Sequence, residues 1–333
     1  MGRQGDSGTN EQQAPLVSVR ELRKHYPLNG GLLRKGAAVK AVDGVSFDIQ
    51  PGETFGLVGE SGCGKSTLGR AILRLFDITS GEIHFAGQAI AHAREKELKP
   101  LRKRMQAIFQ DPYSSLNPGM TVRQLVAEPM QIHGYSREEQ RERTETLLYR
   151  VGLKHEHLER FPHEFSGGQR QRISIARALS VRPEFVLCDE PLSALDVSVQ
   201  AQVVNILQDL QQELGLTYLF IAHDLSMVRH ISSRIGVMYL GKLVEVAPAN
   251  ELYQRPAHPY TRALLAAVPQ PDPRIRNLED ATLRGDIPGP TSALPGCKFC
   301  SRCPHAMPVC QTQEPAMQEI APGHFAACWL FNM

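Results

Sequence analysis

The 333-residue sequence has no long apolar run, no excess of charge of either sign and no internal repeat. No stretch reaches the roughly eighteen apolar residues of a membrane span, and residues 1–15 lack the basic and apolar sections of a signal peptide. With 37 Lys and Arg against 35 Asp and Glu, the net charge of +2 lacks the electrostatic footprint of a nucleic-acid-binding protein. A hydrophobic content of 42% and a mean hydropathy of -0.26 therefore predict a cytosolic globular protein of about two domains that binds no nucleic acid.

Cysteine is sparse in the body of the chain, where only Cys63 and Cys188 occur. The other five crowd the C-terminal end. They are Cys297, Cys300, Cys303, Cys310 and Cys328. In a reducing cytosol such crowding favours a metal or a cluster over disulfides.

Short apolar runs and helical periods alternate along the middle of the chain. The runs 54–58, 185–187 and 218–222 are typical of central strands in a parallel sheet that is covered on both faces. The first run is followed by a helical stretch over 65–76, and apolar residues at helical spacing over 203–214 stop at Gly215. This alternation predicts an α/β core with right-handed crossovers.

The remaining segments differ from this core in polarity, periodicity and proline content. Residues 1–15 are polar and are expected to form a flexible tail, whereas 16–49 reads as short strands. Over about 113–180 the pattern turns helical, and Ser136 with Glu139 predicts a capping box. Prolines recur from 248 onward and periodicity is lost, so we expect a core domain over 16–247 and a small C-terminal module over 248–333.

A glycine-rich loop follows the first apolar strand. Residues 59–66 satisfy G-x-x-x-x-G-K-[ST] between a strand and a helix, the context in which backbone amides cradle phosphates. Lys65 is expected to reach the terminal phosphates and Ser66 to ligate Mg²⁺. The residues predicted to bind nucleotide here are Gly59, Ser61, Gly62, Cys63, Gly64, Lys65, Ser66 and Thr67.

Two adjacent carboxylates end the apolar strand near 185. At a strand end beside a phosphate loop, Asp189 is suited to hold Mg²⁺ and Glu190 to polarise an attacking water. The alternative is that both merely mark the end of a strand. Cys63 has two readings as well, a thiolate favoured by Lys65 and a helix N-terminus, or an inert loop thiol.

Residues 166–169 read Ser-Gly-Gly-Gln, which fits a capping box that opens a helix. Together with Phe165 they also resemble the LSGGQ signature of the ATP-binding cassette (ABC) family, with Phe in place of Leu. Both interpretations can hold at once. The resemblance implies a P-loop ATPase core with an N-terminal β subdomain and an α-helical insert.

Further residues match the ABC pattern in chain order. Tyr26 takes the place of the adenine-stacking aromatic, and Gln110 lies in the loop that joins core to insert. Residues 193–196 resemble the D-loop, which brings Asp196 to the nucleotide, and His223 resembles the switch histidine. The family implies a catalytic set of Glu190, His223 and Gln110, a Mg²⁺ set of Ser66, Gln110 and Asp189, and a contribution to a facing cassette's ATP from Ser166, Gly167, Gly168 and Gln169.

The sequence after the core narrows the resemblance. Residues 258–265 read HPYTRALL, and with Pro269 and the cysteine-bearing end they resemble ATPase subunits of bacterial dipeptide, oligopeptide and nickel importers, with most likeness to the dipeptide-type F subunit. This implies a second ATPase subunit, two membrane permease subunits, an extracytoplasmic solute-binding protein and a peripheral place on the cytoplasmic face of the inner membrane. The solute, and whether the second ATPase is a copy of this chain, stay open.

Four cysteines match a pattern that some of these importers use for a [4Fe–4S] cluster. They are Cys297, Cys303, Cys310 and Cys328. Cys300 is additional and is an alternative ligand, and four thiolates also suit Zn²⁺. Because ATP hydrolysis needs no electrons, we expect a structural role for either metal.

The sequence fits two other functional classes less well than an importer ATPase. Soluble cassette ATPases that act on nucleic acid or ribosomes commonly carry two cassettes or a long coiled coil, and this sequence has one cassette and no sustained heptads. A P-loop kinase for a small molecule would leave the signature and His223 unexplained.

Overall fold

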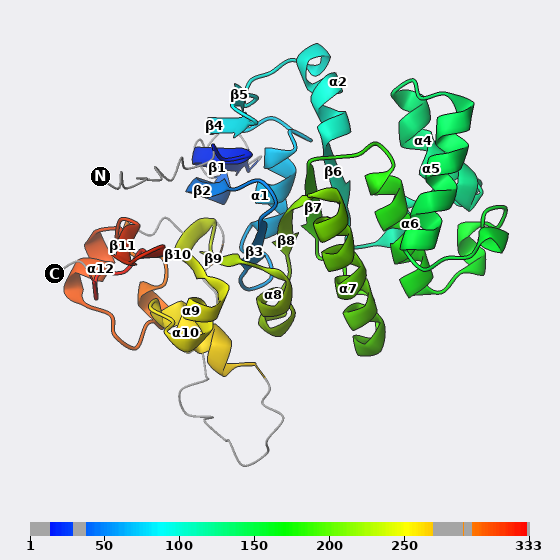
Figure 1. Ribbon diagram of the computed structural model, residues 1–333. Helices are drawn as coiled ribbons and strands as arrows, with labels where there is room; N and C mark the ends of the chain where they lie inside the picture. Colours follow the sequence, from blue (N-terminus) through cyan, green and yellow to red (C-terminus); the bar gives the residue numbers. More distant parts are fainter. Residues whose placement is uncertain (1–13, 29–37, 269–288, 290–294, 332–333) are drawn as a thin grey trace, which may run out of the picture.

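The computed structural model describes residues 14–28, 38–268, 289 and 295–331. An eight-stranded sheet with the order β11-β12-β10-β9-β3-β8-β7-β6 forms the centre of the molecule (Figure 1). Its strands are β3 (Thr54–Val58), β6 (Met105–Ile108), β7 (Phe185–Asp189), β8 (Thr217–Ile221), β9 (Arg234–Tyr239), β10 (Lys242–Pro248), β11 (Gln318–Ala321) and β12 (His324–Ala326). The segment expected as a tail lies almost wholly outside the described residues.

The centre of the main sheet is parallel and buried on both faces. Strand β3 pairs in parallel with β8 and β9, and β7 pairs in parallel with β6 and β8. Every residue of β3, β7 and β8 is buried, including the polar Thr54, Asp189 and Thr217 at their ends, and the apolar runs within them predict this burial. The carboxyl ends of these strands consequently meet at one edge of the sheet, where the phosphate loop also begins.

A second, antiparallel sheet with the order β2-β1-β4-β5 is built from the N-terminal part of the chain. It comprises β1 (Val17–Pro27), β2 (Ala38–Ile49), β4 (Ser80–Phe85) and β5 (Gln88–Ala89). Side chains of this sheet and of α1 (Lys65–Ile72) pack in one apolar cluster with Phe185 and Leu219 of the main sheet. The N-terminal sheet is thereby fixed to the main sheet.

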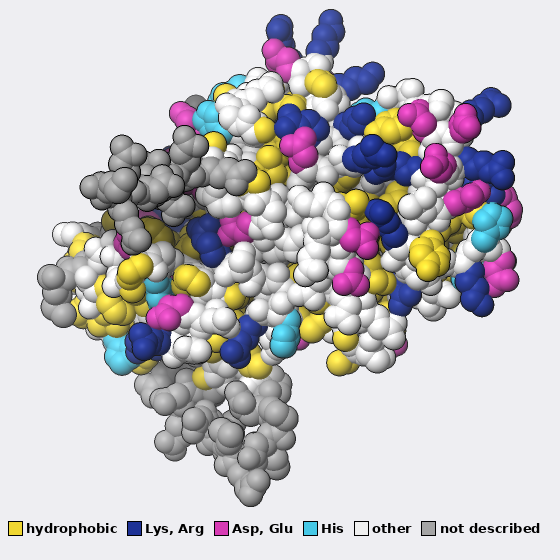
Figure 2. Space-filling view, in the orientation of Figure 1, with side chains coloured by type: hydrophobic (Ala, Val, Ile, Leu, Met, Phe, Trp, Pro, Cys, Tyr) yellow, Lys and Arg dark blue, Asp and Glu magenta, His cyan; other side chains and the backbone are white. Residues whose placement is uncertain are grey.

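Helices occupy most of the chain between β6 and β7. They are α3 (Pro112–Ser115), α4 (Val122–Ile132), α5 (Arg137–Arg150) and α6 (Gly167–Leu179). Figure 1 shows α4, α5 and α6 gathered at one end of the molecule, away from the C-terminal segments. The capping box at Ser136 is confirmed, because Glu139 N–H donates to Ser136 Oγ at 3.2 Å while Ser136 N–H donates to Glu139 Oε2 at 2.8 Å. Figure 2 shows basic and acidic side chains interspersed over α4 and α5.

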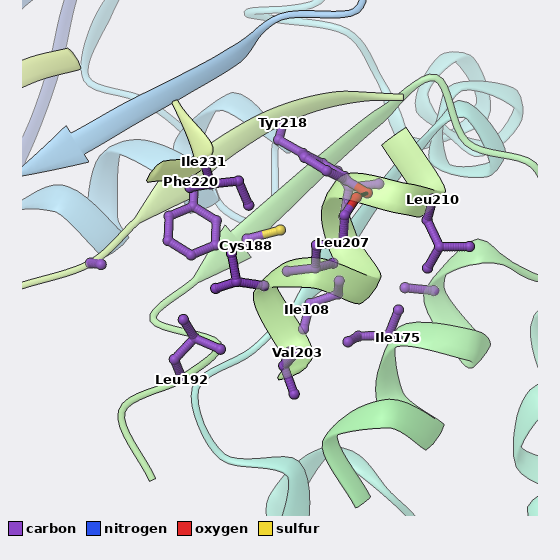
Figure 3. Packing of buried hydrophobic residues seen from close by; sticks show 14 of the residues in the cluster. Ile108, Ile175, Cys188, Leu192, Val203, Leu207, Leu210, Tyr218, Phe220 and Ile231 are labelled. Carbon is purple, nitrogen blue, oxygen red and sulfur yellow. Dashed lines mark hydrogen bonds between the residues drawn. The ribbon is translucent and has the colours of Figure 1, made fainter. Parts of the chain in front are cut away.

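Helix α7 (Val197–Leu214) covers one face of the sheet. Val203, Leu207 and Leu210 turn inward against Cys188, Tyr218 and Phe220, as Figure 3 shows. The buried Tyr218 hydroxyl donates to the Leu207 carbonyl at 3.0 Å, so this polar group has a hydrogen-bond partner within the apolar core. The helix stops at Gly215 in a left-handed conformation (φ 65°), as its sequence predicts.

Two features differ from the sequence-based expectation. Helix α1 ends at Ile72 instead of near residue 76, because the chain turns at Arg74, which has a φ of 51° and whose guanidinium donates to the carbonyls of Ile90 and Phe76. The C-terminal segment, where the sequence loses its periodicity, nevertheless contributes strands, since β12 pairs with β10 and carries β11 into the main sheet.

The remaining helices are short or lie at the edges of the sheets. They are α2 (Glu95–Arg104), α8 (Leu225–Ile231), α9 (Ala249–Gln254), α10 (Pro259–Ala266), α12 (Pro308–Thr312) and the 3-10 turns η1 (His155–His157), η2 (Pro162–Glu164) and η3 (Cys300–Arg302).

Candidate nucleotide site

A cavity of about 320 Å³ lies above the phosphate loop. Residues 61–67 form its floor, and its walls include Val39, Lys40, Ala41, Gln110, Glu190, Leu240, Gly241 and Lys298. Glycine is needed at Gly64, where φ is +107° and a Cβ would lie 2.0 Å from the Ala41 carbonyl oxygen. The loop therefore packs closely against β2 and presents its backbone amides at the N-terminus of α1.

Lys65 is almost fully buried, with 4% of its surface exposed. Its ammonium donates to the carbonyl oxygens of Gly59 at 2.8 Å and Glu60 at 3.0 Å. The charge is thus held directly over the loop, where phosphates would neutralise it.

The Mg²⁺ ligands predicted from sequence come together at this loop. Ser66 Oγ donates to Asp189 Oδ1 at 2.6 Å, and Gln110 lines the same cavity. Arg70, which the sequence analysis missed, donates to Asp189 Oδ2 at 3.0 Å. A hydroxyl, a carboxylate and an amide oxygen are a donor set that suits Mg²⁺, so the residues fit this ion.

Glu190 lines the cavity beside Gln110. Its backbone has a φ of 49°, which is unusual for a residue other than Gly, Asn or Asp. His223 lies close to it, with Nδ1 3.9 Å from Glu190 Oε2 and 61% of the His223 side chain exposed. His223 thus lies beside the acid, although it does not itself line the cavity.

Other predicted nucleotide residues do not line this cavity. Residues 166–169 form the capping box of α6, in which Ser166 N–H donates to Gln169 Oε1 at 3.0 Å. Asp196 is exposed at the start of α7, and Tyr26 is 40% exposed beside Phe76. Tyr26 pairs across the strands with Val39, which does line the cavity.

Gly168 has no room for a side chain, because a Cβ would lie 2.3 Å from Val199 Cγ1.

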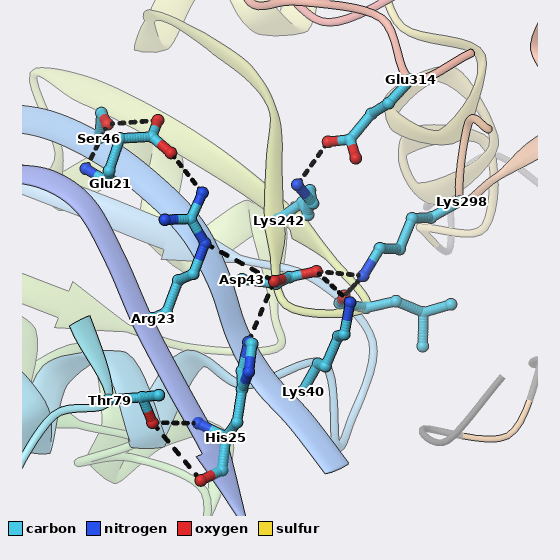
Figure 4. A network of polar contacts seen from close by, with 11 residues as sticks. Glu21, Arg23, His25, Lys40, Asp43, Ser46, Thr79, Lys242, Lys298 and Glu314 are labelled. Atoms are coloured by element: carbon cyan, nitrogen blue, oxygen red, sulfur yellow. Dashed lines mark hydrogen bonds and ion pairs between the residues drawn. The ribbon is translucent and has the colours of Figure 1, made fainter. Parts of the chain in front are cut away.

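Two lysines of the cavity wall were also missed from sequence. Lys298 Nζ lies 3.0 Å from Asp43 Oδ2, and Lys40 Nζ lies 3.7 Å from the same oxygen (Figure 4). Although burial opposes it, the hydrogen bond from Lys298 and the charges of nearby lysines lower the pKa of Asp43 to about 2. No local sequence pattern predicts the ion pair between Lys298 and Asp43, since the two residues are 255 positions apart in the chain.

Of the two readings of Cys63, the burial of the residue favours the inert loop thiol over the activated thiolate. Only 4% of this residue is exposed, and burial raises the pKa of its thiol even though Lys65 pulls in the opposite direction. Low access and a raised pKa both predict slow reaction of this thiol.

The C-terminal cysteines share one neighbourhood. Cys297 N–H donates to the Cys310 carbonyl at 2.8 Å, and burial together with Cys310, Cys328 and Cys303 raises the pKa of Cys297 to about 12. Within the described ranges, however, no group of three or more His, Cys, Asp or Glu side chains is arranged to hold a metal ion. As the thiols stand, their geometry does not fit a cluster or zinc.

Comparison with known proteins places this geometry in a family. Residues 42–193 match the ABC transporter family. The oligopeptide transport ATP-binding protein AppF of Bacillus subtilis (strain 168) is 52% identical over 328 residues, which cover 97% of this chain and 100% of AppF. The chain belongs to the ABC transporter family. It is thus an ATP-binding, ATP-hydrolysing protein, as its phosphate loop and signature predict.

Other matches narrow the type of ABC protein. Residues 244–310 match the oligopeptide/dipeptide transporter C-terminal region. The putative oligopeptide transport ATP-binding protein YkfD of the same organism is 54% identical over 96% of this chain and 97% of its own. No helix in the described part of this ABC protein is long and apolar enough to cross a membrane.

Solved ABC structures share the fold. The ATP-binding cassette MJ0796, in a dimeric post-hydrolysis state bound to ADP and Pi, matches with a TM-score of 0.63 and 29% identity, covering 70% of this chain and 98% of that one. The cbiO1 protein of Clostridium perfringens, part of the ABC transporter complex cbiONQ, matches with a TM-score of 0.64 and 28% identity over 72% and 91% of the two chains.

Proposed function

We propose that this ABC protein powers the import of peptides through separate membrane subunits, from the cytoplasmic face of the inner membrane. The supporting observation is the combination of a complete P-loop site with a C-terminal region that matches oligopeptide and dipeptide transporters. Curated relatives that it matches over almost their whole length are named oligopeptide transport ATP-binding proteins.

Residues in and around the cavity have separate roles in ATP binding and hydrolysis. Lys65 and the loop amides bind the phosphates, and Glu190 orients the attacking water as its base. His223, beside Glu190, contacts the γ-phosphate. Ser66, Asp189 and Gln110 would hold Mg²⁺, which would neutralise negative charge on the phosphates. Tyr26 stacks on the adenine at the edge of the cavity.

A second cassette completes the site. Ser166 is exposed at the N-terminus of α6, and residues 166–169 do not line the cavity of their own chain. Amides at a helix N-terminus attract phosphate, so this segment with Asp196 covers ATP held by a facing subunit. ATP binds the closed pair better than the open one, and hydrolysis therefore resets the pair. The family resemblance favours a different chain as the partner.

One of the two membrane permease subunits docks in a groove of this chain between core and helical insert, and the other docks on the second ATPase subunit. This groove has a volume of about 770 Å³ and contains Gln110, which also lines the nucleotide cavity. Its apolar lining suits a short amphipathic segment of a permease. The larger apolar residues are Leu73, Leu75, Leu98, Leu101, Met105, Phe109 and Pro129, and Arg70, Arg102 and Arg177 are among the polar residues that also line the groove. An extracytoplasmic binding protein delivers the solute to the permeases and does not contact this chain.

A charged substitution in the groove tests the docking surface. Leu75 is 46% exposed within the groove, and Leu28 is 44% exposed outside it, so the two form a matched pair. Leu75→Asp should reduce recovery of the permeases when the complex is purified in mild detergent, whereas Leu28→Asp should not. Equal recovery with both variants would place the docking surface elsewhere.

The transported solute is tested by transport itself. The purified complex, reconstituted in proteoliposomes with its binding protein, should take up labelled di- and oligopeptides in an ATP-dependent manner. Uptake of nickel without uptake of peptides would overturn the peptide assignment while leaving the ATPase function intact.

A [4Fe–4S] cluster on Cys297, Cys303, Cys310 and Cys328, or Zn²⁺ with Cys300 as an alternative ligand, stays a prediction. The gathering of the thiols supports it, and their geometry does not. Anaerobically purified protein should contain about four iron atoms per chain if the cluster forms. Colourless protein with stoichiometric zinc would favour zinc, and protein without either metal would leave the cysteines as thiols.

A further inference from the structure

Residues of the C-terminal segments form hydrogen bonds with Glu60, the first variable position of the P-loop motif. Its carboxylate accepts two hydrogen bonds from Arg302, at 2.8 Å from Nη1 to Oε2 and at 3.0 Å from Nη2 to Oε1. The Arg302 side chain is only 5% exposed and that of Glu60 is 19% exposed. A shielded, forked pair of this kind fixes both distance and orientation.

The backbone of Glu60 is held by a second C-terminal residue. Its N–H donates to the hydroxyl of Tyr260 at 2.8 Å. Tyr260 is fully buried in α10, and its ring packs against Tyr239 and Phe299 with centroid distances of 4.6 and 5.4 Å. The hydroxyl is therefore a fixed acceptor and not a mobile side-chain tip.

These contacts place Glu60 at the junction between two parts of the chain. Arg302 lies 242 residues beyond it, in the turn η3, and Tyr260 lies 200 residues beyond it. The Glu60 carbonyl accepts from Lys65 at 3.0 Å on the cavity side. One residue thus connects the C-terminal segments to the ammonium group that meets the phosphates.

We propose that Arg302 is a positioning residue of the nucleotide site, acting through Glu60. By fixing Glu60, it holds the phosphate loop in the conformation that binds ATP, so that the C-terminal region sets nucleotide affinity. The inference rests on the proposed nucleotide-binding role of the loop. It assigns Arg302 no contact with the nucleotide.

A mutant cycle in the assembled transporter tests this role. Arg302→Met and Glu60→Gln should each raise KM for ATP about tenfold, with kcat changed by no more than about twofold, because only loop positioning is lost. The double variant should be no worse than either single variant, since both remove the same contact. Arg302→Lys, which retains charge without the fork, should restore part of the affinity.

A matched control separates positioning from general anchoring of the C-terminal region. Lys242 of β10 makes a 2.5 Å ion pair with Glu314, which also joins core to C-terminal region but includes no residue of the P-loop motif. Lys242→Met should leave KM unchanged. Circular dichroism and thermal unfolding of every variant show whether the fold is retained.

Two results would overturn the proposal. One is an unchanged KM in folded Arg302→Met, and the other is an equal rise in Lys242→Met. Failure of the wild-type protein to bind ATP at all would instead refute the nucleotide-binding function, so the two ideas fail in distinguishable ways.

Discussion

Ser66 Oγ lies 2.6 Å from Asp189 Oδ1, although 123 positions separate the two residues in the chain. Asp189 is fully engaged, since Arg70 holds its other oxygen. Strand β7 ends at Asp189, and the chain turns at Glu190, whose φ is 49°. Asp189 contacts Ser66 and Arg70 of α1, whereas Glu190 lines the cavity. This divergence assigns different tasks to two chemically similar side chains.

Glu190→Gln should keep ATP binding and abolish turnover. The amide preserves the shape of the side chain but cannot accept a proton from water, so hydrolysis in the assembled complex should fall by about 10²-fold or more. The closed pair of cassettes should accumulate with ATP and be visible by size-exclusion chromatography. Glu213→Gln, which changes an exposed glutamate paired with Arg150, should have wild-type activity. Turnover near the wild-type rate in the first variant would remove Glu190 from its role.

Acid should lower the free energy of unfolding partly by protonating Asp43. The pKa of this carboxyl is lowered to about 2 in the folded protein, below its ordinary value. Its contribution to stability is therefore complete above about pH 4 and is lost as the pH falls toward 2. Asp43→Asn should be less stable than wild type at pH 7, and the difference should shrink at pH 3. Urea unfolding at the two pH values measures this.

Lys298→Met serves as the partner variant for Asp43→Asn, because it removes the main hydrogen-bond donor to the carboxylate. It should reproduce the same loss of pH dependence. A difference between wild type and Asp43→Asn that does not change with pH would contradict the ion-pair explanation.

Cys63 should react slowly with alkylating agents. Burial limits access to the thiol and raises its pKa, so iodoacetamide should label it about tenfold or more slowly than free cysteine at pH 7.5. Peptide mass spectrometry measures the rate at this position separately from the other cysteines. Labelling as fast as free cysteine would show that the loop opens readily and exposes the thiol.

Leu207→Ala should destabilise the core. Leu207 is fully buried under the sheet, so the substitution leaves a cavity and should lower the free energy of unfolding by about 2–5 kcal/mol. Ile132→Ala removes a side chain that is 65% exposed and should change it by only about 0.5 kcal/mol or less. Chemical denaturation gives both values. Equal effects would mean that α7 does not carry the core packing described.

The sequence by itself determined the ATPase core and its family. The P-loop, the acidic pair at the end of β7 and the signature are contiguous motifs, and the buried strands are unbroken apolar runs. Capping boxes at Ser136 and Ser166 were also readable, since both partners lie within one turn. Local chemistry of this kind needs no knowledge of distant contacts.

Only the tertiary structure decided how the C-terminal region meets the nucleotide site. The contacts of Glu60 with Arg302 and of Asp43 with Lys298 span more than two hundred residues and leave no periodic pattern. Strands β11 and β12 are too short to show an alternation, and their place in the sheet depends on pairing with β10. The pKa of Cys63 followed burial and not its neighbouring charge, because desolvation by surrounding residues outweighs the attraction of Lys65.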